Sequence, residues 1–259
     1  MEINIVEEIG RLKEEKEAII LVHNYQRSEI QDIADFLGDS LRLAKEAAKT
    51  DARLIIFCGV RFMAETAKIL SPEKVVLLPR REAGCPMADM ITSEELRALK
   101  ERNRDAKVVS YVNTNADVKA ESDVCCTSAN AVKVVENVRA RRIIFVPDRN
   151  LASYCQRFVH KKMIPWNGYC YVHERITKEE VLLAKKRFPD APLLVHPECC
   201  PEVIDVADEV LSTSGMVDFA KKSAEKRFLI GTEEGLIYRL KKENPEKEFY
   251  AAGTPKICR

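Results

Sequence analysis

The chain has 259 residues, of which 46% are hydrophobic and 32% charged, and 42 Lys and Arg balance 41 Asp and Glu. This composition excludes a disordered chain, and a net charge of +1 offers no basic surface for a nucleic acid backbone. The N-terminal segment is acidic and amphipathic, unlike a signal peptide, and no apolar run reaches the ~18 residues of a membrane span. We therefore expect a cytoplasmic globular protein that binds neither nucleic acid nor membrane.

Three stretches of the sequence read alike, and each ends in a cysteine, with 85 and then 88 residues between successive cysteines (Cys85, Cys170 and Cys258). Each stretch begins with a short apolar run that predicts a buried strand, at 19–22, 107–112 and 192–195. An amphipathic helix, a second strand (54–59, 142–147 and 227–232), a second helix and a third short strand are then expected. The ordinary rhythm of an α/β chain is the alternative explanation, but it would not place a cysteine at matched positions.

The repeat predicts the fold class. Alternating strands and helices indicate parallel sheets covered by helices on both faces, which makes an α/β protein of three homologous αβα units. We place these units at residues 1–86, 87–171 and 172–259. Each unit is small for independent stability, so we expect the three to pack around a pseudo-threefold axis and to form a central cleft that holds the active site.

Polar side chains stand where the first strand of each unit ends. Ligands of parallel sheets bind at the carboxyl ends of strands, and side chains two residues apart point to the same side. Imidazole, phenol, amide and carboxylate groups at such positions suit proton transfer. The three pairs are His23 with Tyr25, Tyr111 with Asn113, and His196 with Glu198, and His173 follows Cys170 by three residues.

A small hydroxyl residue precedes the first amphipathic helix of each unit. Ser40, Ser128 and Thr213 or Ser214 are expected to be N-cap residues. Because the N-terminus of a helix favours anions, three such ends around one cleft would suit a substrate that carries carboxylates or a phosphate. Plain capping remains the alternative.

The three repeated cysteines lack the short CxxC spacing of a zinc ribbon. If the units surround an axis, Cys85, Cys170 and Cys258 converge, and three thiolates suit iron and sulphide. A cubane cluster on three cysteines keeps one iron open to substrate as a Lewis acid, whereas three buried thiols are the alternative. Cys58 and Cys155 are expected to be structural, and the pairs Cys125–Cys126 and Cys199–Cys200 have no assigned role.

A set of motifs, in order, covers nearly the whole chain: HNYQ at 23–26, DIADFLGDS at 32–40, FMAETAKIL at 62–70, YVNTNADVKAESD at 111–123, TSANAV at 127–132, PDRNLA at 147–152, GYCYVHE at 168–174, HPEC at 196–199 and STSGM at 212–216. With them the chain resembles the quinolinate synthase family, iron–sulphur enzymes of NAD biosynthesis.

The resemblance implies a transferase with a [4Fe–4S] cluster on Cys85, Cys170 and Cys258. It implies condensation of iminoaspartate with dihydroxyacetone phosphate to quinolinate, with loss of phosphate and two waters. An enzyme that produces iminoaspartate is then a possible partner. The family's active-site positions correspond to His23, Tyr25, Ser40, Tyr111, Asn113, Ser128, His173, His196, Glu198, Ser212 and Thr213.

Among these residues we expect Glu198 to be the base toward carbon, and Tyr25 with His173 to exchange protons at oxygen. The others would bind and orient the substrate, with His23 and His196 also polarising it. The family usually continues beyond the position of Cys258, so we expect a C-terminal segment to follow Arg259. Two other functions stay open: a non-catalytic iron–sulphur sensor or scaffold, and a cluster-dependent hydro-lyase acting on another small acid.

Overall fold

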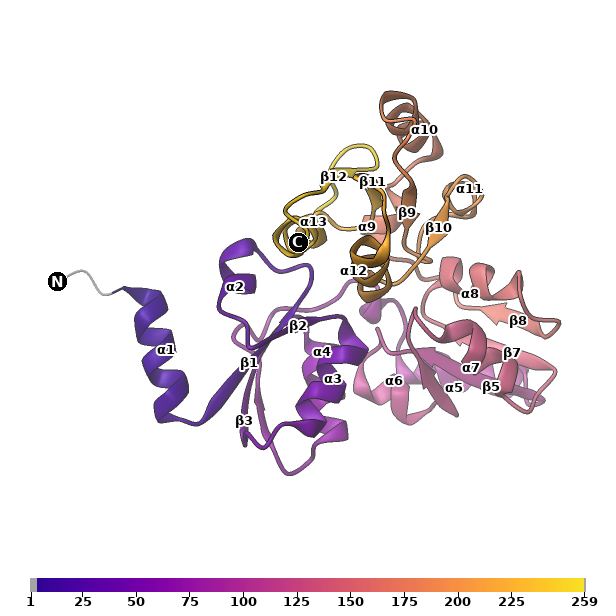
Figure 1. Ribbon diagram of the computed structural model, residues 1–259. Helices are drawn as coiled ribbons and strands as arrows, with labels where there is room; N and C mark the ends of the chain where they lie inside the picture. The colour runs from indigo at the N-terminus through magenta and orange to yellow at the C-terminus, as the bar shows by residue number, and fades with distance from the viewer. Residues whose placement is uncertain (1–3, 259) are drawn as a thin grey trace. The chain divides into compact units, whose positions relative to one another are not determined.

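The computed structural model describes residues 4–258 and contains three four-stranded parallel sheets (Figure 1). The ends of the predicted first and third units, residues 1–3 and 259, lie outside the described part. The chain divides into two compact units, with the break between Gly84 and Cys85. The first unit holds one sheet and the second unit holds two. No helix in the described part is long and apolar enough to cross a membrane.

The first unit forms a sheet with the strand order β2-β1-β3-β4. Its elements are α1 (Ile5–Glu15), β1 (Ala18–His23), α2 (Ser28–Asp32), β2 (Phe36–Gly38), α3 (Ser40–Lys49), β3 (Leu54–Cys58), α4 (Arg61–Leu70) and β4 (Val75–Leu77). Helices α3 and α4 pack against each other.

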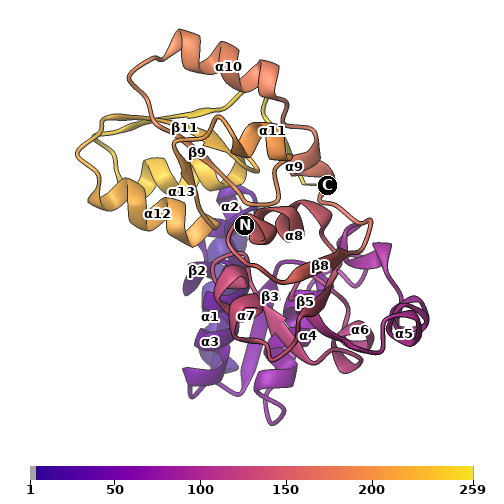
Figure 2. The same ribbon diagram turned by 90° about the vertical axis from the view of Figure 1, so that its right-hand side faces the viewer.

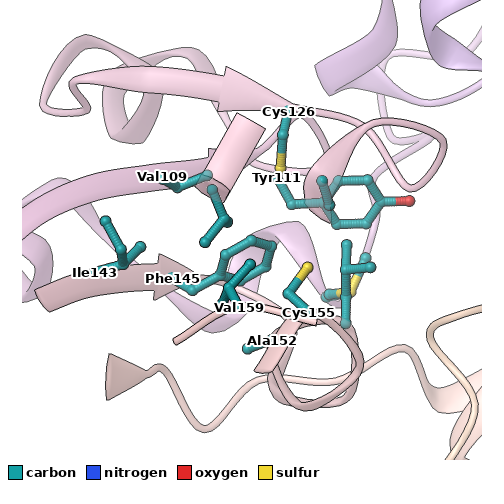
Figure 3. Packing of buried hydrophobic residues seen from close by; sticks show 12 residues of the cluster. Val109, Tyr111, Cys126, Ile143, Phe145, Ala152, Cys155 and Val159 are labelled. Carbon is teal, nitrogen blue, oxygen red and sulfur yellow. The ribbon is translucent and has the colours of Figure 1, made fainter. Parts of the chain in front are cut away.

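The second sheet repeats this order as β6-β5-β7-β8. Its elements are the 3-10 helix η1 (Ala88–Met90), α5 (Ser93–Arg102), β5 (Ala106–Tyr111), α6 (Ala116–Ala120), β6 (Val124–Cys126), α7 (Ala131–Asn137), β7 (Arg142–Val146), α8 (Arg149–Gln156) and β8 (Lys162–Pro165). Phe145 of β7 is fully buried between Val109 of β5 and Cys155 of α8 (Figure 3). Burial of such a phenyl ring contributes up to about 3 kcal/mol, so α8 is fixed on the sheet.

The third sheet has the order β10-β9-β11-β12. Its elements are α9 (Tyr171–Glu174), α10 (Lys178–Arg187), β9 (Leu193–Val195), α11 (Pro201–Ile204), β10 (Glu209–Val210), α12 (Thr213–Lys222), β11 (Arg227–Gly231), α13 (Gly235–Glu243) and β12 (Glu248–Ala251). Figure 2 shows α10 and α11 on one side of this sheet and α12 and α13 on the other. The layers are therefore helix, sheet and helix.

These observations confirm the α/β class and the three αβα units, but each sheet has four strands where we expected three. The missed strands β2, β6 and β10 are three, three and two residues long. These short segments lie outside the longer apolar runs from which the other strands are predicted. The unit boundaries, the pseudo-threefold axis and the central cleft stay predictions.

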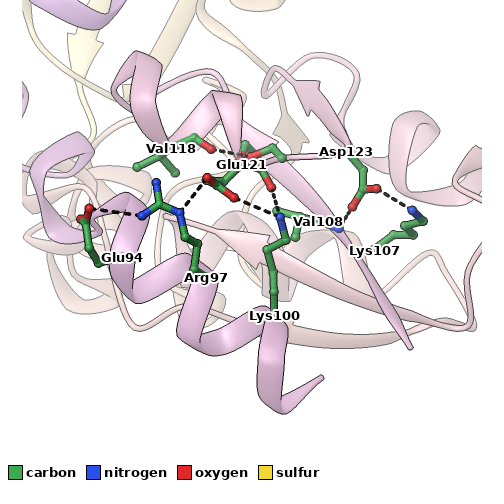
Figure 4. Close-up of polar contacts among 10 residues, drawn as sticks. Glu94, Arg97, Lys100, Lys107, Val108, Val118, Glu121 and Asp123 are labelled. Atoms are coloured by element: carbon green, nitrogen blue, oxygen red, sulfur yellow. Dashed lines mark hydrogen bonds and ion pairs between the residues drawn. The ribbon is translucent and has the colours of Figure 1, made fainter. Parts of the chain in front are cut away.

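In each sheet one aspartate forms the same pair of hydrogen bonds with the backbone of the first strand. Asp35, Asp123 and Asp208 each accept a hydrogen bond from the backbone of the first strand, at Ile20, Val108 and Leu193. The backbone N–H of each aspartate donates to the carbonyl of that same residue. A lysine pairs with each carboxylate, as Lys107 does with Asp123 in Figure 4. We call this set of contacts the aspartate bracket. It recurs in all three sheets, which supports the repeat independently of the cysteines.

In each sheet a lysine binds the C-terminus of an equivalent helix; this lysine is buried in the first and third sheets and partly buried in the second. Lys74, Lys161 and Lys247 donate to carbonyls at the ends of α3, α7 and α12. Each lysine reaches two carbonyls three residues apart; for Lys247 these are Ala220 at 2.5 Å and Ser223 at 2.8 Å. The last carbonyls of a helix lack partners within it, so these ammonium groups satisfy acceptors that would otherwise be buried unpaired.

The predicted N-caps are wrong by one or more residues. Asp39 caps α3 and Ser212 caps α12, so Ser40 and Thr213 are the first helical residues. Helix α7 begins at Ala131 after Asn130, which leaves Ser128 outside the helix. Aspartate caps a helix as well as serine does, which explains Asp39, whereas the hydroxyl that caps α12 lies one residue before the predicted position.

Candidate active site

The functional residues of the third sheet follow β9, whose three residues Leu193–Val195 are fully buried. The backbone N–H of His196 donates to the carbonyl of Gly231 and extends the ladder between β9 and β11. His196 and Glu198 therefore stand at the carboxyl end of the sheet, where they are 4% and 2% exposed.

Glu198 lies at the centre of a buried chain of polar contacts. The Tyr111 hydroxyl, from the end of β5, donates to Glu198 Oε1 at 2.6 Å. His173 Nδ1, from α9, lies 2.8 Å from Glu198 Oε2. On its other side, His173 Nε2 lies 2.8 Å from the Thr232 hydroxyl, directly after β11. The chain thus joins residues that are far apart in the sequence.

His196 adds a second imidazole to this group. Its ring stacks on His173, with the ring centres 4.6 Å apart. Its Nδ1 accepts from the backbone N–H of Glu198 at 3.3 Å and lies 3.8 Å from Glu198 Oε2. An Nδ1 that accepts this bond leaves Nε2 to carry the proton of the neutral ring.

The charge of Glu198 is set by these neighbours. Burial by itself raises the pKa of the carboxyl, but the neighbouring imidazoles of His196 and His173 and the hydrogen bond from Tyr111 bring this pKa down to about 2. Burial and the charge of Glu198 raise the pKa of Asp148 well above its usual value. The ionised carboxylate therefore resides on Glu198.

The three repeated cysteines surround this group. Cys170 Sγ and donor atoms of His173 and Glu198 lie within 4.8 Å of one another. Cys85 has Cys170 and Cys258 as electrostatic neighbours, and Glu198 is an electrostatic neighbour of all three thiols. Burial raises the pKa of the Cys85 thiol to about 12, so the thiols stay protonated unless a cation binds. Soft donors held close together fit an iron–sulphur group.

Two further predicted residues line one pocket. Ser128 and Ser212 border a pocket of about 690 Å³ together with Pro197 and Gly215. Thr213 is buried next to Ser212. Asn113 Oδ1 and Ser214 Oγ are buried, and neither has a hydrogen-bond partner in the described structure. These groups can accept or donate to a polar ligand.

The first unit presents its own strand-end pair. β1 ends at His23, and the backbone N–H of Tyr25 donates to His23 Nδ1 at 3.2 Å. The two rings meet edge to face, with centres 4.6 Å apart. Ser40 opens α3 of the same unit.

Sequence reasoning missed Thr232 and Asp148. Both follow the second long strand of their sheet, β11 and β7, at the same carboxyl edge as the first strands. The rule applied to β1, β5 and β9 would have found them had it been extended to these strands. The role of each site residue stays a prediction.

Comparison with known proteins is consistent across the chain. The family profile described as quinolinate synthetase A protein matches residues 7–259. The quinolinate synthase of Geobacter sp. strain M21 is 58% identical over 251 residues, 97% of this chain and 83% of that protein. The quinolinate synthase of Thermodesulfovibrio yellowstonii is 58% identical over 254 residues, 98% of this chain and 84% of that protein. The quinolinate synthase of Methanoregula boonei is 56% identical over 252 residues.

Proposed function

The chain belongs to the quinolinate synthase family, and from this premise we propose that it condenses iminoaspartate with dihydroxyacetone phosphate. The products are quinolinate, one phosphate and two waters, which balances every atom of the two substrates. In reaction class this is a transferase. A sensor or scaffold would need the cysteines but not the buried Tyr111–Glu198–His173–Thr232 contacts.

We propose a [4Fe–4S] cluster on Cys85, Cys170 and Cys258, supported by the matched place of each cysteine at the end of its repeat and by the position of Cys170 beside His173 and Glu198. His173 and Glu198 also approach Cys170, but Glu198 Oε1 accepts from the Tyr111 hydroxyl and His173 Nε2 contacts the Thr232 hydroxyl. They are therefore better suited to proton transfer than to iron. When bound, such a cluster supplies an iron that acts as a Lewis acid toward a substrate oxygen.

Glu198 is the proposed base that removes protons from carbon. Tyr111 holds one of its oxygens and His173 holds the other, so the carboxylate keeps one orientation. A carboxylate whose pKa lies near 2 is a weak base at neutral pH. The contacts that lower this pKa would therefore have to weaken as substrate binds for the carboxylate to take a proton from carbon.

His173 lies between Glu198 and the Thr232 hydroxyl, with Nδ1 2.8 Å from Glu198 Oε2 and Nε2 2.8 Å from the hydroxyl, so its imidazole is within reach of both groups. His196 stacks on His173 and presents Nε2, which suits a hydrogen bond to a substrate carboxylate or carbonyl. From the first unit, Tyr25 would exchange protons at a substrate oxygen and His23 would polarise a carbonyl.

The substrate's anionic groups are the proposed ligands of the remaining residues. Ser212 and Ser128 share one pocket, and Thr213 belongs to the first turn of α12, where N–H groups favour anions. Asn113 has a buried carbonyl oxygen that needs a donor, such as the imine N–H. Ser40 would serve in the same way at the start of α3.

Two further proposals concern the surroundings of the enzyme. Iminoaspartate is an imine and hydrolyses in water, so an enzyme that produces it must act nearby or at high rate. We assign the protein to the cytoplasm, where disulfides are disfavoured and nine free cysteines are compatible with iron–sulphur assembly.

The buried contacts of Glu198 beside Cys170 carry this proposal, and Glu198→Gln tests it. Protein loaded with iron and sulphide without oxygen should form quinolinate from the two substrates. Because glutamine cannot accept the proton, Glu198→Gln should lower turnover by about 100-fold or more. Its iron content should match wild type. The exposed Glu202 provides the control Glu202→Gln, which should keep full turnover. Full turnover in Glu198→Gln would contradict the assignment.

A further inference from the structure

A backbone contact recurs next to each of the three repeated cysteines. In each repeat, a backbone N–H at the start of the helix that follows the second long strand (α4, α8 or α13) donates to a carbonyl. This carbonyl belongs to the residue two positions before the cysteine. The three bonds run from Arg61 to Ala83, Arg149 to Gly168 and Glu234 to Lys256, at 2.8, 2.8 and 3.0 Å. Each cysteine segment is thus tied to the helix that follows the second long strand of its own repeat.

The residue just before each donor differs among the repeats. It lies two positions after β3, β7 and β11, and it is Val60, Asp148 and Glu233, respectively. Asp148 is 0% exposed and Glu233 is 2% exposed. A buried carboxylate is costly unless its oxygens accept hydrogen bonds, so these two residues require specific partners.

In both residues, each of the two side-chain oxygens accepts one hydrogen bond from a backbone N–H. Asp148 Oδ1 accepts from Leu151 N at 2.6 Å, and Oδ2 accepts from Cys170 N at 3.1 Å. Glu233 Oε2 accepts from Gly235 N at 2.7 Å, and Oε1 accepts from Cys258 N at 3.2 Å. Each carboxylate therefore bridges the first turn of a helix and the backbone of one cysteine.

We propose that Asp148 and Glu233 are positioning residues for Cys170 and Cys258, which they anchor to α8 and α13 so that two of the three thiol ligands are in place before iron binds. The inference rests on the proposed cluster and deepens it. Each carboxyl group would act through the backbone N–H of its cysteine. Groups that orient metal ligands in this way typically change metal affinity about 10-fold to 100-fold when mutated.

The first repeat holds its cysteine by other means. Val60 has no acceptor in its side chain. The thiol of Cys85 is instead approached by backbone N–H groups of Met87 and Ala88, and its carbonyl accepts from Asp89 N at 3.1 Å. The turn at η1 therefore fixes the backbone of Cys85, as a carboxyl group does for Cys170 and for Cys258.

Cys258 depends more on its anchor than Cys170 does, because few other described contacts hold the segment around Cys258. Lys256 Nζ pairs with Glu180 at 3.0 Å, and Tyr171 hydrogen-bonds the Cys258 thiol. Gly253 opens the segment with φ 113°, where a Cβ would lie 2.7 Å from the Cβ of Glu180. Loss of the Glu233 bond should consequently loosen Cys258 more than loss of the Asp148 bond loosens Cys170.

Glu233→Gln and Asp148→Asn test the proposal, since each amide keeps one acceptor and replaces the other by an NH₂ group that cannot accept. Asparagine caps helices as well as aspartate, so α8 keeps its cap. Glu234→Gln is the matched control, because Glu234 uses its backbone N–H in this region. Two readouts apply: the rate at which a chelator removes iron from loaded protein, and amide hydrogen exchange of the cysteine peptides in iron-free protein.

We expect iron release to become about 10-fold faster or more in both variants, and faster in Glu233→Gln than in Asp148→Asn. Exchange should rise at the Cys258 peptide in Glu233→Gln and at the Cys170 peptide in Asp148→Asn, with the melting temperature of the protein little changed. Glu234→Gln should match wild type. If iron release stays within twofold of the wild-type rate and amide exchange is unchanged, the proposed anchoring role of Asp148 and Glu233 is wrong, while the cluster assignment stands. A wild-type protein that takes up no iron would overturn the cluster and the anchors with it.

Discussion

The first strands of the first and third sheets end in the same backbone hydrogen bond, but the side chains at that point differ. After β1 and after β9, the N–H of the second residue beyond a histidine donates to Nδ1 of that histidine. The residue that provides this N–H is Tyr25 in one sheet and Glu198 in the other. The aspartate bracket and the lysine at the helix end are likewise shared. The repeat therefore preserves the scaffold, while single side chains at its edges set the chemistry.

The largest expected effect breaks the site and spares the scaffold. Cys170→Ser should abolish cluster binding and turnover, because a serine oxygen is a harder and poorer ligand for iron–sulphur groups. Cys155→Ser is the control, since Cys155 is fully buried in the core of the second sheet and is not one of the proposed ligands. Iron and sulphide analysis with visible absorption measures both. Equal iron content in Cys170→Ser and wild type would remove Cys170 from the ligand set.

The next effect breaks the scaffold and spares the site. Lys247→Met removes the ammonium group that binds the carbonyls of Ala220 and Ser223. Leaving buried carbonyls unpaired should lower the free energy of unfolding by about 1–3 kcal/mol. Urea denaturation measures this change. Lys222→Met, on the exposed end of the same helix, should change stability by less than about 0.5 kcal/mol. A loss as large in Lys222→Met would point to the helix dipole rather than to the two bonds.

A smaller effect separates a cap from a candidate substrate ligand. Asp39 caps α3 through Arg42 N, so Asp39→Ala should lower the free energy of unfolding by about 1 kcal/mol. Ser40→Ala should alter stability by less than about 0.5 kcal/mol and should raise the KM for substrate. Thermal melts and steady-state kinetics distinguish the two residues. A stability loss confined to Ser40→Ala would restore the hydroxyl as the cap.

The smallest effect concerns the aspartate bracket of the second sheet and depends on pH. Burial raises the pKa of Asp123, but the Lys107 contact and the Val108 N–H outweigh it and hold this pKa below its usual value. A lowered carboxyl pKa stabilises the fold above the unfolded-state pKa of about 4, and this gain disappears as pH falls through the folded pKa. Asp123→Asn should therefore cost less than about 1 kcal/mol at neutral pH, and less still in acid.

Denaturation of Asp123→Asn and wild type at several pH values checks the sign. The pKa of Asp208 is also lowered, with Lys185 as its partner, so Asp208→Asn should follow the same trend. A difference that grows in acid would contradict the charge-based explanation.

The sequence predicted the parts of this molecule that depend on pattern. Apolar runs located β1, β5 and β9, and their carboxyl ends led to His23, Tyr111, His196 and Glu198. The short strands β2, β6 and β10 escaped because their partners, rather than their own side chains, make them strands. The carboxylates Asp148 and Glu233 escaped because their partners lie about twenty residues away along the chain, and only the folded structure joins a helix start to a cysteine N–H.

The closure of each sheet within a single stretch of chain has a consequence for synthesis. Every strand pairs only with strands of its own repeat, so each sheet can form as soon as its segment leaves the ribosome. The repeated cysteines instead come last in each segment, and Cys258 follows Cys85 by 173 residues. On the proposed assignment, the nascent chain completes its scaffold stepwise but acquires a three-thiol site only in one late event. Iron delivery then acts as the final step of maturation rather than as a nucleus for folding.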